Sequence, residues 1–157
     1  MLSKLTDTEI EELLGRQVVG RLGCHADGKT YVIPISYAYD GKYIYCHTEE
    51  GMKIDFMRKN PDICLQVDNI DNLAHWQSVI LWGKFEELTE KHERNLALET
   101  LTKRKLSTIS SNVAHLYPLW PFTSEDLNEV GGIVFRILPV EKTGRYETNQ
   151  HPMGYPM

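Results

Sequence analysis

The sequence predicts a mainly β protein (α+β by count), a six-stranded antiparallel barrel with helices packed outside it. Residues 17–48 are rich in Val, Ile and Tyr and are interrupted only by Asp27-Gly28 and Asp40-Gly41. Asp-Gly between extended runs favours a tight hairpin, because glycine accepts the positive φ of such turns. A doubly wound parallel sheet needs strands that alternate with helices, and this chain has few helices.

Length and charge narrow the class of protein. The 157 residues, of which 41% are hydrophobic, predict a single domain over 1–149, with a flexible tail at 150–157. A net charge of −5 argues against a nucleic-acid partner. No apolar run approaches about 18 residues, which argues against a membrane span. The N-terminus carries acids where a signal peptide would be basic, so we expect a cytoplasmic protein.

Local signals place the elements in order. A capping box of Thr6 and Glu9 predicts a helix that ends at Gly15, and Thr89 is the expected cap of a later helix. Gly83 permits a bulge in a long strand. Helices are expected within 5–16 and at 51–59 and 89–106, and strands at 17–26, 30–39, 42–48, 62–69, 76–88 and 131–147.

The joint "CHTEEGMK" carries the first candidate site. Cys46, His47 and Thr48 end a strand, and Lys53 follows Gly51 at the start of a helix. Free N–H groups, the helix dipole and an ammonium group together can hold a phosphate. A lysine in a first turn is more often merely solvated, and a lone histidine such as His47 is more often structural than catalytic.

Two strands carry further candidates. Pro34, inside "YVIPISYAY", cannot donate a ladder hydrogen bond, which predicts an edge strand or a bulge. That position is either a barrel corner or a place where free backbone groups meet a flat polar ligand. Ser78, inside "WQSVILWG", either bonds to the backbone or contacts a ligand.

Other side chains fit simpler explanations. The pairs Cys24-His25 and Cys46-His47 would form a zinc site only if their strands paired, and buried cysteines that act as small apolar residues are the better interpretation. The aromatic group in 107–129 is interpreted as core or subunit interface, with a lid over a ring system as the alternative; it comprises Tyr117, Trp120 and Phe122.

Taken together, these segments resemble the pyridoxamine 5'-phosphate oxidase-like, FMN-binding split barrels, in the branch that includes nitroimidazole-resistance proteins. The resemblance rests on "YVIPISYAYDGKYIYCHTEEGMKIDFMRKNPDICLQVD" and "SVILWGKFEEL". It covers residues 5–90 well and the last strand loosely. The fold that it implies is a six-stranded antiparallel split β-barrel with peripheral helices.

The resemblance implies a homodimer that holds two FMN molecules at the subunit interface. Lys53 would bind the FMN phosphate, with the backbone of Met52 beside it. The other residues implied at the cofactor are Cys46, His47 and Thr48 at the phosphate and ribityl end, Ile33, Pro34, Ile35 and Ser36 beside the isoalloxazine, and Ser78 from the fifth long strand.

The sequence also departs from the true pyridoxamine-phosphate oxidases. Their arginine-rich strand reads "YVIPIS" here, and Met52 replaces their second basic residue. Their C-terminal arginine and histidine motif is absent from "GRYETNQHPMGYPM". The resemblance therefore implies the FMN fold more strongly than it implies oxidation of pyridoxamine phosphate.

Three functions follow as hypotheses. The first is an FMN-dependent oxidoreductase that reduces a small acceptor such as a nitroaromatic or a quinone. The second is a non-enzymatic flavin- or haem-binding module, suggested by His47, His115 and His151. The third is a redox-inactive dimer that keeps only the scaffold. Fold alone does not separate these hypotheses, because function resides in the site.

Overall fold

The computed structural model of the chain describes residues 2–104 and 127–148. The predicted tail at 150–157 and the aromatic group Tyr117, Trp120 and Phe122 lie outside these residues. In the described part, no helix is long and apolar enough to cross a membrane. The helices are α1 (Asp7–Arg16), α2 (Met52–Lys59), α3 (Lys91–Lys103) and a short 3-10 helix (Leu127–Glu129).

One antiparallel sheet organises the described residues. Its strands follow the order β3-β2-β6-β7-β8-β5-β4, and β1 pairs with β8. The strands are β1 (Leu2–Lys4), β2 (Val19–Ala26), β3 (Lys29–Ser36), β4 (Ala38–Tyr39), β5 (Ile44–Thr48), β6 (Asp62–Asn72), β7 (His75–Glu87) and β8 (Ile133–Glu147). The prediction of a mainly β split barrel with peripheral helices is confirmed. The short strand β1 is an addition to the six predicted strands, and the predicted strand 30–39 is divided at Tyr37 into β3 and β4.

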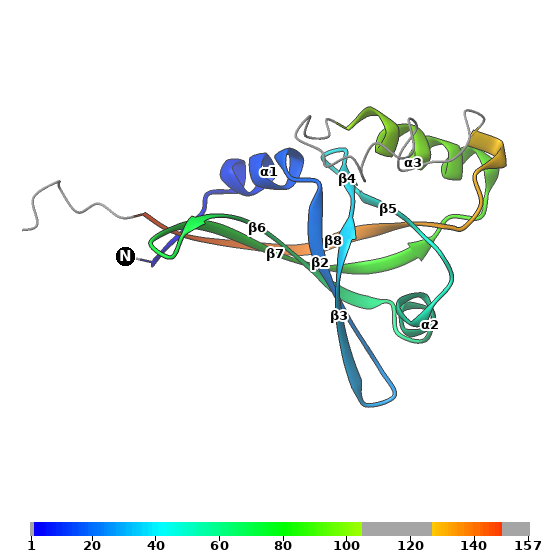
Figure 1. The fold of residues 1–157 in the computed structure, drawn as a ribbon, viewed down its shortest axis with the longest axis horizontal. Helices are drawn as coiled ribbons and strands as arrows, with labels where there is room; N and C mark the ends of the chain where they lie inside the picture. Colours follow the sequence, from blue (N-terminus) through cyan, green and yellow to red (C-terminus); the bar gives the residue numbers. More distant parts are fainter. Residues whose placement is uncertain (1, 105–126, 149–157) are drawn as a thin grey trace, which may run out of the picture.

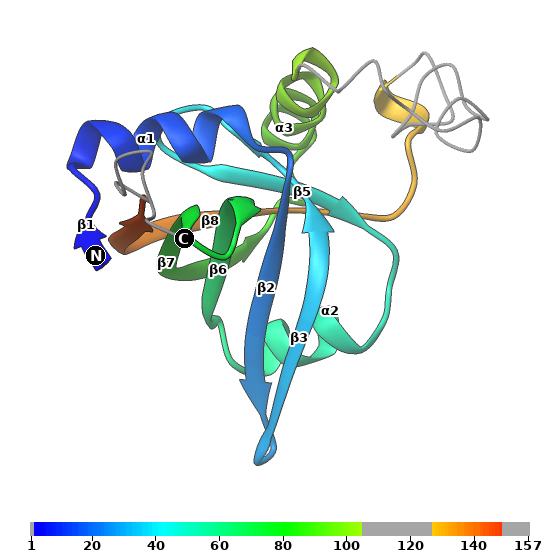
Figure 2. The ribbon, with the colours of Figure 1, turned by 60° about the vertical axis from the view of Figure 1, so that its left-hand side comes forward.

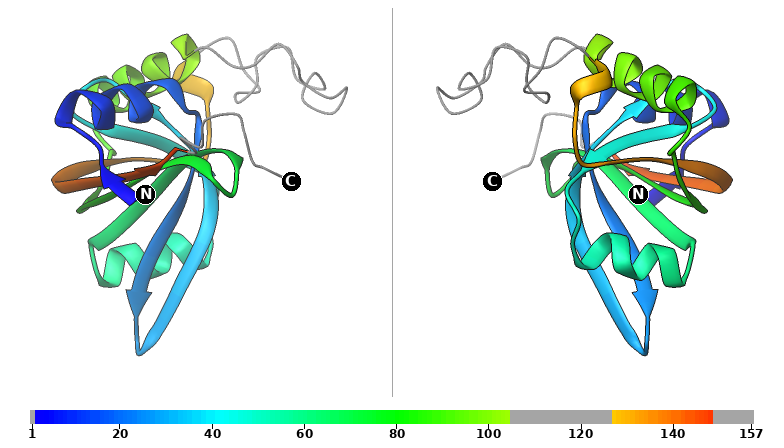
Figure 3. Two further views of the ribbon diagram at one scale, coloured as in Figure 1. Left: turned by 90° about the vertical axis from the view of Figure 1, so that its left-hand side faces the viewer. Right: turned by 90° about the vertical axis from the view of Figure 1, so that its right-hand side faces the viewer.

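The sheet is strongly twisted and does not close. Figure 1 shows α1 and α3 near the top of the view and α2 near the bottom, and Figure 2 shows the β2–β3 hairpin projecting beyond the rest of the sheet. The side views in Figure 3 show the strands fanned between these helices. The two ends of the strand order are β3 and β4, so these are the open edges of the sheet.

Hairpin chemistry explains the turns. Asp27 and Gly28 both have positive φ, 53° and 75°, as a two-residue turn between twisted strands requires. Gly41 has φ 93°, and Asp40 Oδ1 accepts hydrogen bonds from the amides of Lys42 and Tyr43. Both Asp-Gly turns therefore form where the sequence predicts them.

Two helix ends differ from the prediction. The Thr6–Glu9 capping box forms, but α1 continues through Gly15 to Arg16, because Gly15 does not adopt a positive φ and the amide of Gln17 bonds to Leu13 O at 3.1 Å. The cap of α3 is Glu90 and not Thr89. The two oxygens of the Glu90 carboxylate accept hydrogen bonds from the amides of His92 and Glu93. The single hydroxyl oxygen of Thr89 would satisfy two amides less well.

The core lies inside the curve of the sheet. α1 and α2 cover the larger cluster with Leu13, Leu14, Ile54 and Met57, each at most 1% exposed. A smaller cluster lies under α3 and contains Leu98 and Leu101, among others. On β7, Val79 and Leu81 face the core, whereas Ile80 and Trp82 face outward, as the period of two in a strand requires. The sheet therefore has one buried face and one partly apolar outer face.

Gly83 brings β7 and β8 unusually close together. The register of the two strands shifts between Trp82 and Gly83, at the predicted bulge position. A Cβ atom on Gly83 would lie 2.5 Å from Leu138 O and 2.7 Å from Ile137 Cγ2. Because Leu138 O belongs to the backbone, it cannot move away as a flexible side chain would.

We expect Gly83→Ala to lower the free energy of unfolding by about 1–3 kcal/mol through this overpacking. Gly15→Ala is the matched control, since a Cβ there meets nothing within 4 Å and alanine favours a helix, so it should gain about 0.5–1 kcal/mol. Urea unfolding of both variants measures the difference. Equal stability of the two variants would contradict the close approach of β7 and β8.

Candidate functional site

The opening in the sheet gathers most of the predicted cofactor residues. β3, with Ile33, Pro34, Ile35 and Ser36, is the first strand of the sheet order, so its outer edge has backbone groups without a strand partner. Pro34 thus lies on an edge strand, as predicted. Across the opening, β3 approaches β5, and Ile35 and Cys46 belong to the same buried cluster.

Ser36 contributes a buried hydroxyl at the end of this edge. Its Oγ atom is shielded from solvent and has no hydrogen-bond partner among the described residues. A buried hydroxyl without a partner costs free energy, so such groups in native proteins usually meet a ligand, an ion or a water molecule. The next residue, Tyr37, is fully buried, and its amide donates to Val18 O at 2.9 Å, which fixes the end of β3.

The three candidate residues at the end of β5 differ in how far they are buried. The Cys46 side chain is fully buried, and burial raises the pKa of its thiol to about 12, against the opposing charges of Arg104 and Lys53. Cys46 can therefore offer a ligand only its backbone. His47 and Thr48 are half-buried and face the segment that enters β8.

His47 is held by that segment. Its Nε2 atom lies 2.7 Å from Gly131 O, and because a carbonyl only accepts, Nε2 carries the proton. Gly132 has φ 79°, and a Cβ atom there would lie 2.7 Å from Thr48 O and 3.0 Å from His47 Nε2. Glycine is therefore required both by the backbone conformation and by the space beside β5.

Arg94 of α3 fixes the same segment from the other side. Its Nη2 atom donates to Val130 O at 2.7 Å and lies 3.3 Å from Gly131 O and Gly132 O. Arg94 and Gly132 are not among the site residues that the sequence predicts. The paired glycines before the last strand were a usable signal for close backbone approach, whereas nothing local marks Arg94, which is remote in sequence.

Lys53 differs from the other cations of α2. Arg58 forms ion pairs with Glu50 and Glu87, and Lys59 forms one with Asp27 at 2.7 Å. Within residues 2–104 and 127–148, the half-buried Lys53 has no carboxylate partner. The N-cap of α2, Gly51, provides no side-chain hydrogen bond, so the first-turn amides of the helix also lack a side-chain cap. An ammonium group and uncapped amides thus coincide at this joint, next to the exposed Met52.

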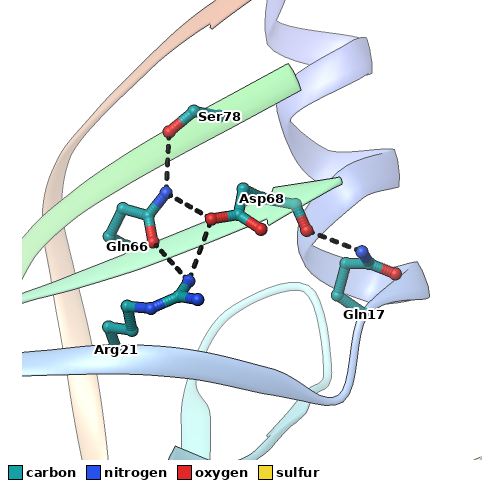
Figure 4. Close-up of polar contacts among 5 residues, drawn as sticks. All are labelled: Gln17, Arg21, Gln66, Asp68 and Ser78. Carbon is teal, nitrogen blue, oxygen red and sulfur yellow. Dashed lines mark hydrogen bonds and ion pairs between the residues drawn. The ribbon is translucent and has the colours of Figure 1, made fainter. Parts of the chain in front are cut away.

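Ser78 lies elsewhere. It is on the outer face of β7, where it accepts a hydrogen bond from Gln66 of β6 at 2.9 Å. Figure 4 shows Ser78 in a polar network with Arg21, Gln66 and Asp68. Among the described residues, no hydrogen bond joins the Ser78 side chain to β3, β5 or α2, so the single chain does not bring Ser78 together with the other candidates.

The zinc alternative fails on strand order. β2 carries Cys24-His25 and β5 carries Cys46-His47, and these strands are not neighbours in the sheet. Among the described residues, no cluster of His, Cys, Asp and Glu could hold a metal ion. Cys24 and Cys46 are buried, as the simpler interpretation predicted, and Cys64 is half-buried. His115 and His151, two of the three histidines behind the haem hypothesis, lie outside the described residues.

Comparison with protein families gives one match over nearly the whole chain. A family model described as pyridoxamine 5'-phosphate oxidase matches residues 6–146. An uncharacterised protein of Rhizobium meliloti is 38% identical over 90 residues, which are 55% of this chain. The aligned region spans only 60% of the length of that curated relative.

Solved structures share the fold. A FAD-binding protein from Mesorhizobium loti superposes with a TM-score of 0.71 at 29% identity, covering 94% of this chain and 99% of that one. A candidate 5-nitroimidazole antibiotic resistance protein from Bacteroides thetaiotaomicron gives 0.70 at 18% identity, with coverages of 93% and 87%. The FAD-binding protein from Mycobacterium smegmatis gives 0.64 at 19% identity, with coverages of 92% and 98%.

Proposed function

Because the chain belongs to the pyridoxamine 5'-phosphate oxidase family, we propose that it binds FMN and reduces a small acceptor such as a nitroaromatic or a quinone. The observation that carries this proposal is Lys53, the α2 cation without a described carboxylate partner, at a helix start whose amides lack a side-chain cap. The FAD-binding relative from Mesorhizobium loti supports a flavin in general. The choice of FMN and the acceptor class come from the sequence resemblance.

The phosphate would bind at the start of α2. The positive end of the helix dipole and the first-turn amides favour a dianion there, and the Lys53 ammonium adds a charge-assisted hydrogen bond. The nearby Glu50 does not oppose this, because both of its oxygens accept from Arg58 at 3.0 Å. Thr48 and the backbone of Met52 complete the phosphate and ribityl end.

The ring would lie along the outer edge of β3. Backbone groups from Ile33 to Ser36 can match the alternating donors and acceptors of the flavin pyrimidine. The Ile35 side chain is buried in the core, so this residue would contribute its backbone alone. The Ser36 hydroxyl, buried without a described partner, is suited to such a ligand. The residues present therefore fit the group that the family implies.

When bound, the flavin would supply the redox chemistry, with a nicotinamide as the source of the electrons that reduce the acceptor. The role of the chain is then to bind and orient it. His47 keeps its Nε2–H on Gly131 O, which holds the segment before β8 against Thr48. With Arg94, it keeps the end of β5 in place for the cofactor.

We further infer a homodimer formed through the outer face of the sheet. Val32, Trp82 and Val140 are 61%, 41% and 69% exposed and line a groove of about 470 Å³, together with Gly23 and Cys64. An exposed apolar groove on one sheet face is typical of a protein interface. Ser78 shares this face, so a second copy packed here would bring Ser78 toward the flavin of its partner.

We expect Lys53→Ala to raise the Kd for FMN about 10- to 100-fold, as loss of a charged hydrogen bond predicts. Lys59→Ala, on the same helix but paired with Asp27, should leave this Kd unchanged. Flavin fluorescence quenching measures both values. Riboflavin, which lacks the phosphate, should bind wild type and Lys53→Ala alike; a similar loss for riboflavin would argue against a phosphate contact.

The reaction itself can be tested on the FMN-loaded wild type under anaerobic conditions. NADH or NADPH should bleach the flavin absorbance, and a nitroaromatic or quinone should restore it with matching consumption of the acceptor. Flavin that neither nicotinamide reduces would refute the oxidoreductase and leave a non-enzymatic flavin module. Reduced flavin that neither acceptor reoxidises would refute the acceptor class.

Val140→Asp should convert the dimer to a monomer, because the interface would bury an unpaired carboxylate. Leu96→Asp, which alters an exposed leucine of α3 away from this face, is the matched control and should stay dimeric. Sedimentation velocity distinguishes the two states. A monomeric wild type, or a dimer that persists in Val140→Asp, would contradict the assigned interface.

A further inference from the structure

A polar network surrounds Ser78 on the outer face of the sheet (Figure 4). Gln66 Nε2 donates to Ser78 Oγ at 2.9 Å and lies 2.9 Å from Asp68 Oδ2. Arg21 Nη1 lies 3.2 Å from Gln66 Oε1 and forms an ion pair of 2.9 Å with Asp68. The register explains the grouping, since Arg21 stands opposite Gln66 and Asp68 stands opposite Ser78.

This network fixes the orientation of the Gln66 amide. A guanidinium group only donates and a carboxylate only accepts, so the amide oxygen must face Arg21 and the amide nitrogen must face Asp68. A flipped amide would set donor against donor and acceptor against acceptor. The nitrogen that reaches Ser78 is therefore assigned by chemistry, although oxygen and nitrogen have nearly the same shape.

The fixed amide determines what the Ser78 hydroxyl can do. Gln66 donates to it, so Ser78 Oγ acts as the acceptor in that bond. Among the described residues, Ser78 has no second hydrogen-bond partner, and its proton remains available for an acceptor outside this set. The Arg21–Asp68 ion pair also offsets the carboxylate charge, so that Ser78 is not beside an uncompensated anion.

We propose that Gln66 is a positioning residue that directs the Ser78 hydroxyl proton toward an acceptor atom of the flavin in the partner subunit. This inference rests on the proposed function, in which the outer face forms the dimer. Gln66 itself need not touch the cofactor. Gln17 donates to Asp68 O at 2.7 Å and so anchors the strand through its backbone; in the part of the chain that the structure describes, no hydrogen bond joins Gln17 to Gln66 or Ser78.

The test is a double-mutant cycle on the apo-protein titrated with FMN. Ser78→Ala should raise the Kd about tenfold, and Gln66→Met, which keeps the side-chain length but cannot donate, about three- to tenfold. If Gln66 acts through Ser78, the double variant should bind no more weakly than Ser78→Ala alone. Gln66→Glu should bind at least as weakly as Ser78→Ala, because a carboxylate accepts the Ser78 proton. Gln17→Met is the control and should change the Kd less than about twofold.

Each outcome of the cycle is decisive. The positioning role would be overturned if the increases in Kd caused by Gln66→Met and Ser78→Ala multiplied in the double variant. An unchanged Kd in Gln66→Met would also overturn it. Urea unfolding of the apo-variants confirms that they fold. If Gln66→Met does not fold, Gln66→Asn replaces it, because the asparagine side chain is too short to reach Ser78.

Subunit mixing separates this inference from the proposed function. Heterodimers of Lys53→Ala and Gln66→Met chains should regain wild-type affinity at one of their two sites, because one site then receives both intact side chains. No regain would overturn action on the partner's flavin. Weakened binding in Lys53→Ala but not in Ser78→Ala would overturn this inference alone, whereas a wild type that binds no FMN would overturn both.

Discussion

The pairing of β7 with β8 is the interaction on which the rest of the structure depends. These two long strands occupy the middle of the sheet, with β6, β2 and β3 following on one side and β5 and β4 on the other. The sheet twists as it extends from this ladder, so its two edges turn toward each other without joining. The opening beside the candidate flavin-binding residues therefore results from the central position of the β7–β8 ladder and from the extent of the outer strands.

The inner and outer faces of the sheet differ in their composition and in what covers them. The inner face is filled by apolar side chains and covered by α1 and α2, which leaves the edge of β3 and the end of β5 as the candidate positions for a ligand. The outer face combines an apolar groove around Trp82 with the Arg21–Gln66–Asp68 network. In the proposed dimer, the site would combine the edge of one subunit with the outer face of the other, so no side chain would have to cross the core.

Much of the fold and part of the site could be predicted from local patterns. Asp27-Gly28, Gly83 and the Thr6–Glu9 capping box act within a few residues of themselves, and each forms where the sequence places it. The family resemblance is also confirmed by the match over residues 6–146. The errors at Gly15 and Thr89 are shifts of one or two residues at helix ends, where neighbouring groups compete for the same amides.

The sequence by itself determined the long strands, the tight turns and the coincidence of Lys53 with a helix start, because each depends on the spacing of nearby residues. Only the tertiary structure decided that Arg58 and Lys59 are paired while Lys53 has no described carboxylate partner. It also decided that the Ser36 hydroxyl is buried and that Ser78 lies beside Gln66. It also brought Arg94 to the glycines before β8. These facts depend on strand order and on contacts between residues far apart in the chain, which local propensity and spacing do not encode.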